Sequence, residues 1–216
     1  MKNLVVLTGA GVSAESGIST FRDAGGLWEG HDVMEVASPQ GFAANPELVL
    51  NFYNQRRAQL KEVAPNHAHH CIAAMERNFN VHVITQNVDD LHERAGSSKV
   101  IHLHGELRKV RSSKNYMDQK YWENDLHLGD LCDAGSQLRP HIVWFGEEVP
   151  AMEQAIEITA KADVLLIVGT SLQVYPAAGL KDFAPQHCPI YFVDPNPSLE
   201  SKGRLKVLAE KASTGV

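Results

Sequence analysis

The chain opens with a short apolar run, Leu4 to Leu7, that leads directly into the glycine turn Gly9-Ala10-Gly11. An apolar run of this length predicts a strand buried on both faces, as in a parallel sheet covered by helices. The glycines permit a tight turn and let the backbone approach a pyrophosphate. The pattern Gly-x-Gly-x-x-Ala is typical of dinucleotide-binding turns, although taken alone it is as consistent with an ordinary strand-to-helix turn.

The rest of the chain alternates short apolar strands with helical segments, which predicts an α/β fold with a doubly wound parallel sheet. Asn45-Pro46 has the sequence of a helix start, because it combines an N-cap with a proline at the first helical position. Further strands are expected at 81–85, 100–103, 164–168 and, as the last strand, 190–193, and helices at 46–61, 66–75 and 151–162. The polar stretch 112–137 has no clear period and is predicted to be a small inserted module.

Composition limits the classes of partner. The net charge of −6 and the sequence pI near 6.0 give no chain-wide attraction to nucleic acid or to an anionic membrane. No stretch approaches the roughly 20 apolar residues of a membrane span, and the opening run is too short for a signal sequence. The three cysteines are scattered and odd in number, so we expect free thiols and a cytoplasmic location.

The region after the glycine turn argues against an ordinary dehydrogenase. A hydride-transfer site needs an acidic residue at the end of a second strand about 20 residues further on. Here that region is the segment Phe21 to Gly30, FRDAGGLWEG, which predicts a mobile loop anchored by two aromatic residues.

Polar residues follow two of the predicted strands, where open parallel sheets bind ligands. Gln86, Asn87 and Asp89 follow the strand at 81–85, and Gly169-Thr170-Ser171 follows the strand at 164–168. Their amide, carboxylate and hydroxyl groups suit a carboxamide, a ribose or a phosphate. The alternative is a pair of polar loops, the first of which caps the next helix with an aspartate.

His102 and His104 alternate along a predicted strand, so both are expected to face the same side of the sheet. Such histidines serve as metal ligands, as a catalytic base or as buried residues with satisfied hydrogen bonds. Gly105 permits a close backbone approach, which favours His104 as a site residue and general base. Further along, the stretch 139–147 is either a core strand or an edge that pairs with an extended peptide.

Five blocks occur together in one order: GAGVSAESGISTFR, TQNVDDLH, HLHGEL, RPHIVWFGE and GTSLQVYPAA. In this order, spread from Leu4 to Asn196, they closely resemble the signature blocks of the sirtuin family. The resemblance implies a Rossmann-like NAD-binding domain with a small inserted domain, formed by segments of approximately 24–65 and 108–140 within a single catalytic domain of 1–216. It places an acylated lysine side chain of a protein or peptide in the cleft between the two parts.

The resemblance also implies roles for individual residues. His104 is the catalytic base, with Asn87 and Asp89 as further catalytic residues. The implied NAD-binding residues are Gly9, Ala10, Gly11, Ser13, Phe21, Arg22, Gln86, Asn87, Asp89, Gly169, Thr170, Ser171 and Asp194. The implied peptide-binding residues are Val143, Trp144, Phe145 and Gly146.

The implied chemistry is not hydride transfer. In sirtuins the acyl oxygen attacks the nicotinamide ribose and expels nicotinamide, after which a histidine base activates a ribose hydroxyl. The products are free lysine and O-acyl-ADP-ribose. A non-catalytic NAD-binding module, an NAD-consuming hydrolase and an ADP-ribosyltransferase remain alternatives, and the oligomeric state is left open.

The chain departs from the family pattern in two places. Sirtuins usually hold a structural zinc with two Cys-x-x-Cys pairs, but here Ser112 stands at the first cysteine position and the insert holds only Cys132. We therefore expect no metal, with a substitute set of His127, Asp130, Cys132 and Asp133 as the weaker alternative. Asp194 stands where the family usually has an asparagine.

Tyr53 and Arg56 lie three residues apart on the predicted helix 46–61, on one face. A phenol beside a guanidinium can bind a carboxylate, but a core tyrosine and a solvated arginine would give the same pattern. With the small Ala37, the pair resembles the acyl pocket of class III sirtuins, which implies removal of succinyl and malonyl groups and possibly also acetyl groups. Arg57 is expected to point off this face.

Overall fold

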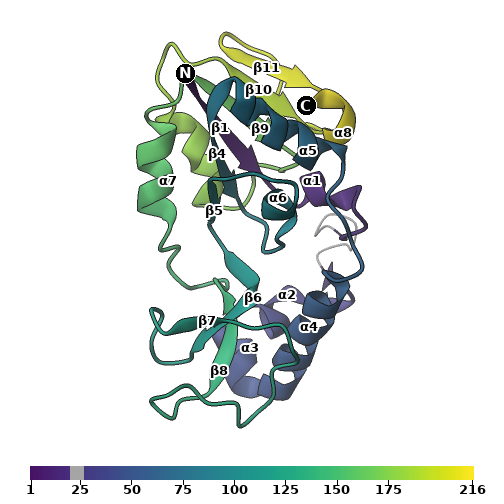
Figure 1. Ribbon diagram of the computed structural model, residues 1–216, viewed down its shortest axis with the longest axis vertical. Coiled ribbons are helices and arrows are strands. Elements are labelled where there is room, and N and C mark those ends of the chain that lie inside the picture. Colours follow the sequence, from purple (N-terminus) through teal and green to yellow (C-terminus); the bar gives the residue numbers. More distant parts are fainter. Residues whose placement is uncertain (20–26) are drawn as a thin grey trace.

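The computed structural model describes residues 1–19 and 27–216. Six strands form one sheet in the order β11-β10-β9-β1-β4-β5, and every neighbouring pair is parallel. Figure 1 shows this sheet in the upper part of the molecule. The strands are β1 (Lys2–Thr8), β4 (Phe79–Thr85), β5 (Val100–His102), β9 (Val164–Val168), β10 (Ile190–Val193) and β11 (Leu205–Leu208).

Helices cover both faces of the sheet, because alternate residues of its strands are apolar on both sides. Val5 and Leu7 of β1 pack toward α7 (Met152–Thr159) and the 3-10 helix η2 (Ala177–Phe183). Leu4 and Val6 pack on the other side, toward α5 (His67–Ala74) and α8 (Ala212–Gly215). Burying one such side chain contributes roughly 1.5–3 kcal/mol. The predicted doubly wound fold is confirmed.

The strand order reverses beside β1. The chain leaves β1 for β4 and β5 on one side, and later fills the other side with β9, β10 and β11. Such a reversal opens a crevice at the carboxyl ends of the two strands that flank it, here β1 and β9. The glycines that follow these two strands therefore lie at the place where this class of sheet binds its ligands.

The lower part of the molecule has its own sheet, in the antiparallel order β7-β6-β8, with helices packed beside it (Figure 1). The three strands of this sheet are β6 (Gly105–Ser112), β7 (Gln119–Tyr121) and β8 (Leu138–Ile142). The same part of the chain also forms a two-stranded sheet of β2 (Leu27–Trp28) and β3 (His31–Asp32), and the helices α2 (Val33–Val36), α3 (Pro39–Ala44) and α4 (Pro46–Gln59). Asn45 caps α4, because its side chain accepts a hydrogen bond from the backbone N–H of Leu48. Phe52, Tyr53 and Trp144 form the centre of an apolar core between α4 and the loop after β8.

Two local predictions were wrong. The segment Ile190–Val193 is not the last strand, because β11 adds a further parallel strand beside it. The sequence LKVL of β11 has a lysine on an edge strand, so its apolar pattern is too short to stand out. His104 does not lie on a strand either: β5 ends at His102, and Gly105, with φ +83°, turns the chain into β6.

No helix of the described residues is both long enough and apolar enough to cross a membrane.

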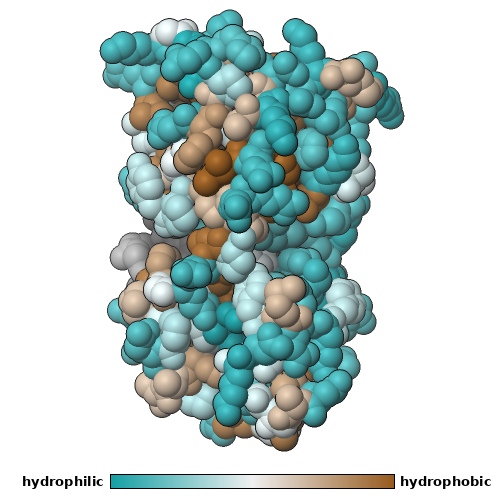
Figure 2. Space-filling view, turned by 90° about the vertical axis from the view of Figure 1, so that its left-hand side faces the viewer, coloured by the Kyte–Doolittle hydropathy of each residue, from teal (hydrophilic) through white to brown (hydrophobic). Residues whose placement is uncertain are grey.

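Figure 2 looks at the side of the molecule that carries α7 and shows apolar side chains among hydrophilic ones in the upper part. Among the apolar residues of α7, Met152 and Ile156 are only partly buried against the core.

Candidate active site

Two glycine loops meet at the reversal of the sheet. The N–H of Gly11 donates to the carbonyl of Gly169 over 2.8 Å, and that of Gly9 donates to Val168 over 3.1 Å. A Cβ on Gly11 would lie 2.7 Å from Gly169, and one on Gly169 would lie 2.3 Å from the backbone nitrogen of Val12. Only glycine permits this approach. The helix α1 (Gly11–Ala14) that follows is a single turn.

The loop after β4 brings three predicted residues to the same edge. Asn87 donates through Nδ2 to the hydroxyl of Ser13 over 3.0 Å, and this hydroxyl donates to Asp89 Oδ2 over 3.0 Å. Gln86 donates through Nε2 to Thr170 Oγ1 over 3.0 Å, which ties the loop after β4 to the loop after β9. Burial raises the pKa of Asp89, although hydrogen bonds from Leu91 and Ser13 oppose it.

His104 is held in one tautomer. Its Nδ1 lies 3.0 Å from the carbonyl oxygen of Gln86. Because a carbonyl only accepts, Nδ1 carries the proton and Nε2 of the neutral ring is free to accept one. Burial lowers the pKa of His104, and the bond to Gln86 opposes this only in part. The ring is therefore neutral near pH 7, as a general base must be.

The remaining predicted cofactor residues flank these loops. Asp194 follows β10, is 1% exposed, and accepts a hydrogen bond from the N–H of Asn196 over 2.9 Å. Thr170 also accepts from the N–H of Leu172, and the carbonyl of Ser171 accepts from Ser198. Ala10 immediately precedes α1. Phe21 and Arg22 lie outside the described residues.

The predicted acyl-binding residues lie in the lower core. Tyr53 is buried, and its hydroxyl oxygen accepts a hydrogen bond from Trp144 Nε1 over 2.9 Å. Burial raises the pKa of Tyr53, so the hydroxyl keeps its proton as a donor. The guanidinium of Arg56 lies 4.8 Å above the Phe52 ring, and its Nε and Nη1 atoms are buried with no hydrogen-bond partner among the described residues. Ala37 packs in the same core.

Arg57 has a different environment from Arg56. It is 1% exposed, and it donates to the carbonyl of Leu107 over 2.9 Å and to Asn54 Oδ1 over 2.8 Å. Its hydrogen bonds tie α4 to β6 and to the insert. Arg57 is thus used by the fold, although its Nη2 has no partner among the described residues. Arg56 lacks partners at both Nε and Nη1, and its Nη2 donates to the neighbouring Gln55.

The segment Val143 to Gly146 follows β8, and its N–H groups are largely engaged. Val143 donates to the carbonyl of His104, Trp144 to Glu147 Oε2 and Phe145 to the carbonyl of Ala37. Trp144 is 2% exposed and Phe145 42% exposed. A peptide strand would therefore meet the Phe145 side chain, Gly146 and the segment's carbonyls, whereas the Trp144 side chain faces the core.

A buried ionic cluster beneath this segment was not singled out in the sequence. Arg139 binds both oxygens of Glu147 over 2.6 and 3.1 Å, and Arg111 Nη2 lies 3.1 Å from Glu147 Oε1. The Arg139 guanidinium also stacks on Trp144, 3.3 Å from the ring centre. The signal was present in the motif RPHIVWFGE, which begins with the arginine and ends with the glutamate.

The substitute metal set is not assembled. Within residues 1–19 and 27–216, no group of three or more histidine, cysteine or acidic side chains is placed to hold a metal ion. Cys132 is 5% exposed and directs its sulfur to the hydroxyl of Ser112 over 3.5 Å. It packs with Leu50, Val110, Leu126 and Leu138.

These features define a nucleotide-binding α/β protein. Two glycine loops lie where the strand order of the parallel sheet reverses, and a polar loop and a neutral histidine lie at the same edge. The model of the Sir2 family matches residues 9–176. An NAD-dependent protein deacylase of Helicobacter pylori strain J99 is 62% identical over 195 residues, which cover 90% of this chain and 83% of that protein. The chain therefore belongs to the Sir2 family, the sirtuins.

Solved structures agree with this assignment. A crystal structure of a Sir2 homologue in complex with NAD is 43% identical, with a TM-score of 0.87 over 98% of this chain and 85% of that one. A Sir2 complex with a p53 peptide and NAD is 32% identical, with a TM-score of 0.80 over 97% of this chain and 88% of that one.

Proposed function

We propose that this chain removes succinyl and malonyl groups from lysine side chains of proteins, and acetyl groups less efficiently. As a member of the Sir2 family, it is an enzyme that uses NAD to deacylate proteins. The acyl preference rests on one observation: Arg56 has two buried guanidinium nitrogens without partners among the described residues, and it packs on Phe52 of the core that holds the protonated Tyr53 hydroxyl.

Burial makes this arrangement selective. Arg56 is half-buried, so its charge is partly desolvated, and Glu29 is the acidic neighbour that acts on it. A partly desolvated charge with unused donors gains from a further anionic partner. An acyl group that ends in a carboxylate supplies that partner, and Tyr53 adds a donor. The indole N–H of Trp144 occupies a lone pair of the Tyr53 oxygen, so the phenolic hydrogen points elsewhere. An acetyl group has no charge to offer.

The glycine loops and the polar edge fit NAD, since they combine backbone clearance with amide, hydroxyl and carboxylate groups. When bound, NAD supplies a ribose carbon with nicotinamide as the leaving group. We assign the pyrophosphate side to Gly9, Ala10, Gly11, Ser13, Gly169, Thr170 and Ser171, with Phe21 and Arg22 as a cofactor loop, and the adenosine ribose to Asp194. Gln86, Asn87 and Asp89 line the nicotinamide side, and His104 Nε2 accepts the proton of a ribose hydroxyl.

The test is an incubation with NAD and one peptide sequence bearing succinyl-, malonyl- or acetyl-lysine, followed by mass spectrometry. We expect free lysine, nicotinamide and O-acyl-ADP-ribose, with the highest kcat/KM for the acidic groups. Faster turnover of acetyl-lysine would contradict the preference. ADP-ribose in place of the acylated product would favour an NAD hydrolase, and a peptide that carries ADP-ribose would favour an ADP-ribosyltransferase.

We also propose that the chain acts in the cytoplasm, which is consistent with its three free cysteines.

The variant Arg56→Met tests the carboxylate-binding pair directly. We expect desuccinylation to lose on the order of 2–5 kcal/mol in kcat/KM, about 30-fold or more, because one partner of a buried charge pair is removed. Deacetylation should be largely retained. Lys61→Met, which removes a charge at an exposed position just beyond α4, is the matched control. Equal losses on both substrates would mean that Arg56 serves the fold.

A further inference from the structure

His102, the other histidine of the HLHG motif, lies between two groups that can only accept hydrogen bonds. Its Nδ1 is 3.0 Å from the carbonyl oxygen of Asn87, and its Nε2 is 2.7 Å from Glu93 Oε1. The side chain of His102 is 8% exposed. A neutral imidazole has one N–H and can satisfy only one of these partners, whereas an imidazolium satisfies both.

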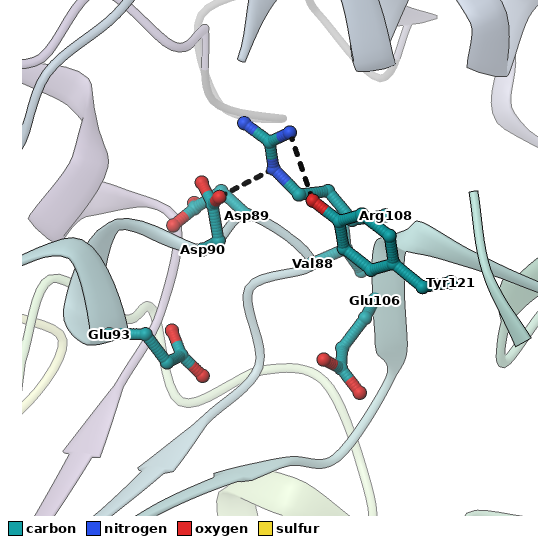
Figure 3. Close-up of a pocket in the computed structure, with 7 residues that line it drawn as sticks. All are labelled: Val88, Asp89, Asp90, Glu93, Glu106, Arg108 and Tyr121. Atoms are coloured by element: carbon teal, nitrogen blue, oxygen red, sulfur yellow. Dashed lines mark hydrogen bonds and ion pairs between the residues drawn. The ribbon is translucent and has the colours of Figure 1, made fainter. Parts of the chain in front are cut away.

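The charges around His102 favour the imidazolium. Figure 3 shows a pocket lined by Glu93 and Glu106, with Arg108 directed to Asp90, and Glu93 is the residue that contacts His102. Lys109 pairs with Glu106 over 2.6 Å, while Asp89 and the uncharged His92 are the other titratable groups close by. Burial lowers the pKa of His102, but the bond and charge of Glu93, then the Asn87 carbonyl and Glu106, outweigh it and raise the pKa above its usual value.

We propose that His102 is a positioning residue for the reaction: its charged ring holds the loop that carries Asn87 and Asp89, and we call this contact the clamp. It joins the end of β5 to both ends of this loop, at the Asn87 carbonyl and at Glu93 of the short helix α6 (Leu91–Arg94). His102 and His104 thus have opposite protonation states: His102 is charged and holds the loop, while His104 is neutral and accepts a proton. This inference rests on the nicotinamide-side roles proposed for Asn87 and Asp89.

The clamp has a consequence for the pH dependence of deacylation. Activity should rise with pH as His104 loses its proton, and should fall again when His102 loses its own, because the neutral ring releases Asn87 or Glu93. A bell-shaped profile results, with its alkaline limb set by His102. Replacing the ionised Glu93 by glutamine keeps the hydrogen bond but removes the charge that stabilises the imidazolium.

Two measurements on the full chain test the clamp. In ¹⁵N NMR of the histidine rings, with His102→Gln to assign the signal, we expect both His102 ring nitrogens to be protonated at pH 7.5, and the ring to titrate above the usual histidine value of about 6.5. A titration at or below about 6.5 would overturn the charged state. Because this readout needs no turnover, it does not depend on the proposed function.

The second measurement is the pH profile of deacetylation by Glu93→Gln, with the acetyl-lysine peptide so that acyl preference plays no part. We expect the alkaline limb to move about 1–3 pH units lower, the usual effect of one close opposite charge. Glu157→Gln, on the exposed side of α7, should leave the profile unchanged. An unmoved alkaline limb, or a loss that is equal at every pH, would overturn the positioning role.

Discussion

At the scale of single residues, the hydrogen-bond partner decides what a side chain can do. His104 is largely buried and Arg56 is half-buried, yet each has a side-chain atom without a hydrogen-bond partner among the described residues. For His104 the carbonyl of Gln86 takes up the Nδ1 proton and leaves Nε2 free. For Arg56 the guanidinium packs on Phe52 and donates from Nη2 to Gln55 Oε1 over 3.5 Å, while Nε and Nη1 have no partner among the described residues. Free donors or acceptors in a buried site are available to a substrate.

The variant His104→Ala tests the proposed base. We expect kcat for deacylation to fall by about 10²–10⁴-fold, the usual cost of losing a general base. NAD binding should persist, because the glycine loops and the loop after β4 make their hydrogen bonds to one another through other groups. Calorimetric NAD binding and single-turnover rates measure the two effects. Retention of more than a tenth of the wild-type rate would remove His104 from this role.

At the scale of elements, helix α4 serves both the proposed site and the fold. Tyr53 and Arg56 contribute to the proposed acyl pocket, while Asn54 holds the insert: its Nδ2 donates to the carbonyl of Leu126 over 3.0 Å, and its Oδ1 accepts from the N–H of the same residue over 2.9 Å. With the apolar cluster around Cys132, this contact attaches the insert to α4.

The variant Asn54→Ala tests this attachment. It leaves the buried Leu126 N–H and carbonyl unpaired, so we expect the free energy of unfolding in urea to fall by on the order of 3 kcal/mol. The exposed neighbour Gln55→Ala should cost less than about 0.5 kcal/mol.

We also expect elemental analysis of the wild type to find no stoichiometric zinc, and chelation to leave Tm and activity unchanged. One zinc per chain, or a Tm lowered by chelation, would contradict this account of the insert.

At the scale of the whole molecule, the ion cluster around Glu147 supports both the stability of the fold and the position of the segment Val143 to Gly146, which we propose to bind the substrate peptide. Glu147 binds Arg111, Arg139 and the N–H of Trp144, and so joins β6, β8 and the loop that follows β8. Burial raises the pKa of Glu147, but the bonds and charges of Arg139, Trp144 and Arg111 outweigh it and lower the pKa below its usual value. Removing one member of such a cluster leaves buried charge unpaired.

Acid should therefore weaken the molecule through Glu147. A carboxylate whose pKa is lower in the folded state stabilises the fold fully above its unfolded pKa of about 4.3, and loses this contribution as the pH falls through the folded value. We expect Glu147→Gln to be less stable than the wild type at pH 7, with a difference that shrinks below about pH 4.3. Urea unfolding between pH 3 and pH 7 measures it. A difference independent of pH would show that charge is not the cause.

The amino-acid sequence by itself determined the class of fold and the order of the site-bearing loops. The apolar runs at Leu4–Leu7 and Val164–Val168 became buried strands, and the helix start at Asn45-Pro46 was correct. These features are local, because a strand, a glycine turn or an N-cap is specified by neighbouring residues. The five ordered blocks also sufficed to predict the family that the comparisons confirm.

Only the tertiary structure decided which of these side chains are free to act. The sequence pattern allowed His102 and His104 the same role, and it placed Trp144 among peptide-binding residues. In the fold, contacts between distant segments give these side chains different roles. Trp144 donates a hydrogen bond to Tyr53, 91 residues earlier. His102 contacts the Asn87 carbonyl and Glu93, whereas His104 contacts the Gln86 carbonyl. Protonation state and donor availability depend on such long-range contacts and on burial, and neither is encoded in the spacing of residues along the chain.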